Sequence, residues 1–175
     1  MAEPVLLVCT HGRHNACCAR TGAPLARALA TRFDRLIWET THVGGDRFAA
    51  NLVCLPHGLS YGDLGEAEAT TAVDAYLRGE VVLDRLRGRA GTPEPAQAAE
   101  HFVREHTGCL GLDEVVVESI IGTSPYEAVV VARQSRYRVI MEAVQQPDPC
   151  GTGCGENQRT YVVRELTLLN EAALV

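Results

Sequence analysis

Hydrophobic and polar positions predict a strand–helix–strand unit at the start of the chain. The apolar run Val5–Cys9 predicts a buried strand. Segment 24–33 repeats apolar residues at helical spacing and begins with a proline, which suits a first helical turn. Segment 36–41 is rich in β-forming residues and predicts a second strand. This order is typical of a crossover helix that lies on a sheet.

The next segments predict a β-hairpin and a second helix. Segments 52–55 and 59–62 read as two short strands joined by a tight turn. Segment 66–77 places apolar residues on one helical face, and Gly79 ends the pattern. The first half of the chain therefore alternates strands and helices, as an α/β protein does.

The second half is predicted to be richer in strands. Segment 85–95 is charged and contains several glycines and prolines, so it reads as a connector. We expect a helix over 96–105, and strands over 115–117, 128–132, 137–144 and 159–169. The pattern predicts a core domain over 1–89 and, over 90–175, an extension of a helix and strands packed on the same domain.

Composition limits the classes of function. The 175 residues are 46% hydrophobic, which is enough for a sizeable core. A net charge of -6 and no clustered basic stripe argue against a nucleic-acid partner. No apolar run has membrane-spanning length, and the N-terminus lacks the features of a signal peptide. We expect a cytoplasmic protein that has no membrane partner.

The seven cysteines are an odd number, which argues against a complete disulfide framework. Cys54 lies in an apolar run and Cys109 follows a predicted helix, so both are expected to be buried packing residues. The others are candidates for metal ligands or reactive thiols.

Two loops carry the candidate chemistry. The first strand ends at Cys9, and a polar loop with two histidines leads to the vicinal pair Cys17–Cys18. The second predicted strand leads into His42 and a loop centred on two glycines. Thiolates and imidazoles are ligands for soft and borderline metals, and thiolates are also redox groups.

These two loops resemble those of a known family. The first reads Cys9-Thr10-His11-Gly12-Arg13-His14-Asn15-Ala16-Cys17-Cys18-Ala19, and the second reads His42-Val43-Gly44-Gly45-Asp46-Arg47-Phe48-Ala49-Ala50-Asn51. They are similar to the sucrase/ferredoxin-like branch of the thioredoxin-like [2Fe-2S] ferredoxins. The likeness extends from about Val5 to Arg89. The second loop resembles that branch's His-x-Gly-Gly-His/Asp loop and has Asp46 at its last position.

The resemblance implies a thioredoxin-like fold, a central mixed sheet flanked by helices, that holds one [2Fe-2S] cluster. It implies Cys9 and Cys18 as ligands to one iron, and His42 and Asp46 as ligands to the other. Gly44 and Gly45 would let the backbone pass close to the cluster. Such a protein is an electron carrier rather than an enzyme, and its partners are a reductase and an acceptor enzyme.

The sequence allows several alternatives. The choice of Cys18 over Cys17 rests on the family spacing alone. Cys150 or Cys154, from the glycine-rich loop 147–155, could replace Asp46 as the fourth ligand, since Asp46 could instead cap a helical turn. Two other classes of protein are a metal-free thiol–disulfide protein that uses Cys17 or Cys18, and a zinc-binding structural protein.

Overall fold

The computed structural model describes residues 3–13, 16–146 and 158–171. The chain divides into two compact units, Met1–Gly91 and Thr92–Val175, and each is described by itself. Predicted features that fall on residues 147–157 lie outside the described residues.

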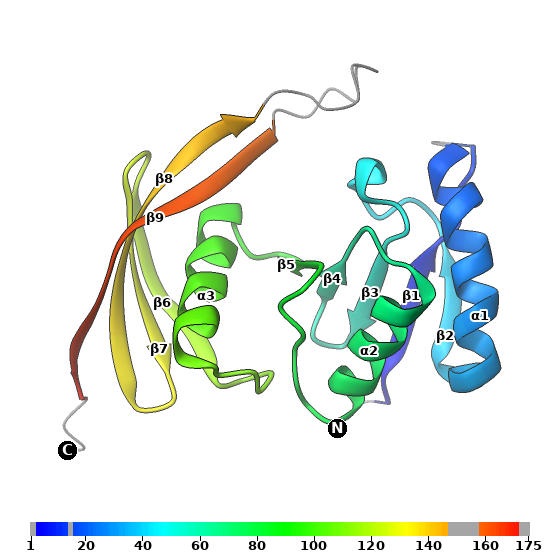
Figure 1. Cartoon of the computed structure of the whole chain (residues 1–175), viewed down its shortest axis with the longest axis horizontal. Coiled ribbons are helices and arrows are strands. Elements are labelled where there is room, and N and C mark those ends of the chain that lie inside the picture. Colours follow the sequence, from blue (N-terminus) through cyan, green and yellow to red (C-terminus); the bar gives the residue numbers. More distant parts are fainter. Residues whose placement is uncertain (1–2, 14–15, 147–157, 172–175) are drawn as a thin grey trace. The chain divides into compact units, whose positions relative to one another are not determined.

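The first unit is built on a five-stranded mixed sheet (Figure 1). Its strands, in the spatial order β2-β1-β3-β4-β5, are Ile37–Thr40, Val5–Cys9, Leu52–Leu55, Leu59–Tyr61 and Leu86–Arg89. β1 and β2 are parallel, and every other neighbouring pair is antiparallel. The crossover between the parallel strands is the helix α1, Ala23–Phe33.

Two helices cover the sheet. α1 contacts β1 and β2, and α2, Glu66–Leu77, contacts β3 and α1. Arg32 of α1 and Asp74 of α2 form an ion pair with an N–O distance of 2.8 Å. Alternate residues of the central strands are fully buried: Leu6, Val8, Leu52, Cys54, Leu59 and Tyr61. The predicted α/β fold class with a central mixed sheet flanked by helices, the hairpin and both helices are confirmed.

The predicted connector over 85–95 is wrong in part, because it contains the strand β5. Leu86–Arg89 pairs with β4 in antiparallel register, with Leu59 opposite Arg89 and Ser60 opposite Gly88. Charged residues and glycine hid the strand from pattern analysis, but both are compatible with an edge strand whose outer side faces water. This strand also carries Arg87, which donates a hydrogen bond to Asn51.

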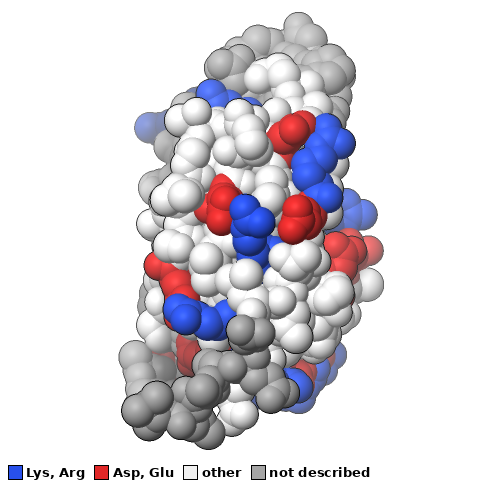
Figure 2. Space-filling model, turned by 90° about the vertical axis from the view of Figure 1, so that its left-hand side faces the viewer, with Lys and Arg blue, Asp and Glu red and all other residues white. Residues whose placement is uncertain are grey.

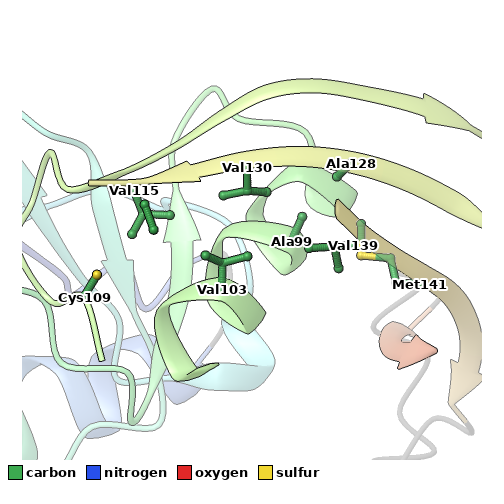
Figure 3. Packing of buried hydrophobic residues seen from close by; sticks show 9 residues of the cluster. Ala99, Val103, Cys109, Val115, Ala128, Val130, Val139 and Met141 are labelled. Carbon is green, nitrogen blue, oxygen red and sulfur yellow. The ribbon is translucent and has the colours of Figure 1, made fainter. Parts of the chain in front are cut away.

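The second unit is a helix packed on an antiparallel sheet. The helix α3, Glu94–Thr107, is followed by β6 (Val115–Gly122), β7 (Tyr126–Ala132), β8 (Ser135–Gln146) and β9 (Gln158–Glu171), paired in sequence order. Residues of α3 and the strands form a common core (Figure 3): Ala99, Val103, Cys109, Val115, Ala128, Val130, Ala132, Val139 and Met141. The C-terminal β-rich extension is confirmed.

Strand β6 extends to Gly122, beyond the predicted 115–117. A register shift between Val117 and Ser119 interrupts its alternation of apolar and polar residues, so the sequence pattern predicted only its first part. Cys54 and Cys109 are 0% and 2% exposed, so the prediction that both are packing residues is confirmed. Burial raises the pKa of the Cys54 thiol to about 12, which keeps it protonated at neutral pH.

Candidate metal centre

Three potential ligands meet at one end of the first unit's sheet. The Sγ atoms of Cys9 and Cys18 and a ring nitrogen of His42 all lie within 4.8 Å of one another. Both cysteines are 1% exposed, and His42 is half-buried. Neither cysteine forms a disulfide bond with another described residue. The structure therefore brings together three of the four residues that the resemblance implied as ligands.

The parallel pairing of β1 and β2 explains why the two loops meet. Cys9 lies opposite Thr40, so both strands leave the sheet at the same edge. Beyond this pair, the Thr10 backbone N–H donates to the Thr40 carbonyl, with an N–O distance of 3.1 Å. The His42 backbone N–H donates to Nδ1 of His11 at 3.3 Å. This bond joins the two loops and requires that Nδ1 of His11 carry no proton.

The cysteine loop is more regular than predicted. Residues 16–17 are already helical, and Cys18–Gly22 form a π-helical turn (η1) that runs directly into α1. The turn lies against the end of β1: a Cβ added to Gly22 would overlap the Cys9 carbonyl oxygen and lie 3.1 Å from the carbonyl carbon. Glycine at this position therefore lets the turn that carries Cys18 approach Cys9.

The structure distinguishes the two vicinal cysteines. Cys18 points into the three-ligand group, whereas Cys17 is exposed and does not belong to it. The Cys17 carbonyl accepts a hydrogen bond of 2.9 Å from the Thr21 hydroxyl, which fixes the helical turn around the pair.

A buried asparagine organises the loop that carries His42. Asn51 is 2% exposed, and its Nδ2 donates to the Gly45 carbonyl at 2.9 Å. Its Oδ1 accepts from Nη1 of Arg87 at 3.1 Å, and its carbonyl accepts from the Cys9 N–H at 3.1 Å. Asn51 thus connects the second loop, the end of β1 and strand β5.

The two glycines of this loop have backbone conformations that disfavour other residues. Gly44 and Gly45 have φ values of 86° and 63°. A Cβ at Gly45 would also overlap the Arg87 guanidinium. The guanidinium groups of Arg87 and Arg47 each lie 4.6 Å from the ring centroid of Phe48, which follows in the same loop.

The fourth predicted ligand, Asp46, belongs to the loop that carries His42. Asp46 begins the short 3-10 helix η3, Asp46–Phe48, but its side chain lies outside the described residues. Cys150 and Cys154, the alternatives from the C-terminal loop, also lie outside them.

Sequence patterns did not single out Gly22, Asn51 or Arg87 as parts of the site. A polar residue directly before an apolar strand was a weak signal for Asn51. Arg87 gave no signal, because its role depends on a partner 36 residues away in the chain.

The donors fit an iron–sulfur cluster or zinc, since two thiolates and an imidazole suit both.

No helix in the described part of the chain is long and apolar enough to span a bilayer.

The chain is similar over about half of its length to solved structures of thioredoxin-like [2Fe-2S] ferredoxin from Aquifex aeolicus. One is 18% identical, covers 54% of this chain and 97% of that chain, and superposes with a TM-score of 0.47. The wild-type protein in another structure is 17% identical. That match covers 51% of this chain and 100% of the other, with a TM-score of 0.45. The match to a cysteine-to-serine variant is 18% identical, covers 50% of this chain and 100% of the other, and also has a TM-score of 0.45.

No curated protein matches the chain significantly. The model of the family described as sucrase/ferredoxin-like matches residues 1–88, which include the whole three-ligand group. The chain belongs to the sucrase/ferredoxin-like family.

Proposed function

We propose that this chain is an electron carrier that binds one [2Fe-2S] cluster and exchanges single electrons with a reductase and an acceptor protein. Cys9, Cys18 and His42 are the ligands in this proposal, and Asp46 is the fourth. The observation that carries the proposal is the convergence of two buried cysteine sulfurs and an imidazole nitrogen within 4.8 Å.

The donor set suits an iron–sulfur cluster. Thiolates are the usual ligands of such clusters, and imidazoles replace two of them on one iron of Rieske centres. When bound, the cluster supplies one-electron redox chemistry. A mixed set of thiolate, imidazole and carboxylate makes the complex less negative than four thiolates do, so it favours a higher reduction potential.

The protein's own residues hold the donors in place and limit access to them. Cys9 and Cys18 are shielded from solvent, which protects the thiolates from water and oxidants. Asn51 and Arg87 fix the second loop, and Gly44 and Gly45 allow its backbone to turn near the donors. In this proposal a redox partner approaches on the side of half-buried His42, the most accessible of the three donors.

The experiment is to purify the protein without air and to measure its visible absorption, iron and acid-labile sulfide. We expect a brown protein with two iron and two sulfide ions per chain, the composition of one [2Fe-2S] cluster. A colourless protein that holds zinc in place of iron would contradict the proposal, and so would a metal-free protein that remains metal-free after reconstitution with iron and sulfide.

A further inference from the structure

The hydrogen-bond ladder between β1 and β2 ends just before the candidate metal centre. The two strands are parallel, and their last register pair is Cys9 opposite Thr40. Continued at the same offset, this register would place His11 opposite His42. The next bond of a parallel ladder would then run from the His42 N–H to the Thr10 carbonyl.

The structure replaces this expected bond with a side-chain bond. The Thr10 carbonyl accepts from the Gly12 N–H at 2.9 Å, so it is bonded within its own loop. The His42 N–H donates instead to Nδ1 of His11 at 3.3 Å. An imidazole therefore takes the place of a backbone acceptor at the point where both strands leave the sheet.

His11 belongs to the loop that joins the two thiol donors. It follows Cys9 by two residues and is half-buried. A Cβ added to the next residue, Gly12, would lie 2.6 Å from the Ala19 Cβ in the turn that carries Cys18. Glycine thus lets the His11 segment approach this turn, which places His11 between the segments that carry the two cysteines.

We propose that His11 is a positioning residue that holds the His42 imidazole beside the sulfurs of Cys9 and Cys18. It acts through the bond from the His42 backbone N–H to its Nδ1 atom. The inference rests on the proposed function, in which His42 is a ligand. It assigns to His11 a role in placing that ligand.

The position of His42 in its loop explains why one bond matters. Before it, the Thr40 carbonyl is held by the Thr10 N–H, and after it, the Gly45 carbonyl is held by Asn51. The bond to His11 fixes the backbone between these two points. Loss of a group that orients a metal ligand typically weakens metal binding by about 10–100-fold.

The test is Co²⁺ binding by the metal-free chain without air, followed by thiolate-to-cobalt absorption. Cobalt accepts thiolate and imidazole donors, and the assay does not require an iron–sulfur cluster. His11→Ala should weaken Co²⁺ binding roughly tenfold or more. His11→Asn should bind within about threefold of wild type, because Oδ1 of asparagine can take the place of Nδ1. His11→Gln carries its oxygen one bond farther from the backbone and should resemble His11→Ala.

A double-mutant cycle separates placement of the imidazole from general support of the loop. His42→Ala keeps the backbone N–H that bonds to His11 but removes the imidazole. In this background, His11→Ala should change Co²⁺ affinity by less than about twofold, because the group that His11 positions is absent. An equal loss of affinity with and without the His42 imidazole would show that His11 only stabilises the loop, and would overturn the proposal.

Two controls in the second unit account for binding of Co²⁺ elsewhere on the chain. His106→Ala removes an exposed imidazole that lies edge-on to Tyr137, so it repeats the substitution away from the centre. Figure 2 shows acidic and basic side chains lying next to one another on one face of the molecule. Arg164→Ala leaves Glu142 without the arginine that it binds at 2.7 Å, so it tests binding by surface carboxylates. Both variants should keep the wild-type affinity.

Wild-type affinity in His11→Ala, or an equal loss in His11→Asn, would overturn the proposal. If circular dichroism shows that His11→Ala is unfolded, the comparison of His11→Asn with His11→Gln decides, and equal affinities of these two variants would refute it. A chain that assembles a [2Fe-2S] cluster but shows no effect of His11 refutes this inference alone. A chain that shows the expected cobalt pattern but assembles no cluster refutes the proposed function and supports the role of His11 in placing His42.

Discussion

Replacing Asn51 with alanine tests whether the loop that carries His42 is held by this one buried side chain. The substitution removes the hydrogen bond to the Gly45 carbonyl and the bond from Arg87. A neutral bond contributes about 0.5–1.5 kcal/mol, and one to a charged group about 1.5–3 kcal/mol. The free energy of unfolding should therefore fall by about 2–4.5 kcal/mol if the loop unfolds together with the rest of the unit.

The assay is urea unfolding of the metal-free protein, followed by cluster reconstitution of the same variant. We expect the Asn51→Ala variant to bind less than half of the wild-type iron, because His42 is no longer held beside the two thiols. Thr71→Ala is the matched control: it removes a hydrogen bond of 2.9 Å on the exposed surface of α2, and its stability should change by about 0.5 kcal/mol or less. Loss of less than about 1 kcal/mol by Asn51→Ala, with full iron content, would refute this role of Asn51.

Four further substitutions test the assignment of the vicinal cysteines, the fourth ligand and the pKa of the buried Cys54 thiol. Cys18→Ser should abolish the visible spectrum while Cys17→Ser preserves it, because only Cys18 lies in the three-ligand group; the reverse result would mean that we have chosen the wrong cysteine. Asp46→His replaces a carboxylate with a neutral ligand and should raise the reduction potential in protein-film voltammetry, toward the range of about -150 to +300 mV of two-histidine centres; an unchanged potential would exclude Asp46 as a ligand. The Cys54 pKa rises from 9.0 to about 12 on folding, so the folded state keeps a proton that the unfolded state loses. The stability that this group contributes is present below pH 9 and is lost as pH rises toward 12, with a slope of up to about 1.4 kcal/mol per pH unit. The free energy of unfolding of the Cys54→Ala variant should therefore depend less on pH over that range than that of the wild-type chain. Equal slopes for variant and wild type would contradict the shift.

The local spacing of apolar residues was sufficient to predict most of the fold. The strands β1 and β3 and the helices α1 and α2 are regular enough that apolar spacing fixes both their type and their position. β5 was missed because its stability comes from backbone pairing with β4, which does not require apolar residues on an edge strand. The end of β6 was missed because a bulge changes which face each residue occupies.

The candidate site was predictable only where its residues are close in sequence or belong to a family motif. The resemblance selected Cys9, Cys18 and His42, and the structure places the three together. The network of Asn51 and Arg87 was not predictable, because it depends on side chains that meet only after β5 joins the sheet. Local spacing does not report which polar groups become partners across a sheet.

The central claim is that Cys9, Cys18 and His42 together hold a [2Fe-2S] cluster, and pulsed electron paramagnetic resonance of the reduced protein tests it most directly. Protein with ¹⁵N-labelled histidine should show a nitrogen coupling that is absent from the His42→Cys variant, while that variant retains a cluster. The same coupling in His42→Cys, or no histidine coupling in a wild-type protein that carries a cluster, would show that His42 is not a ligand and would contradict the account.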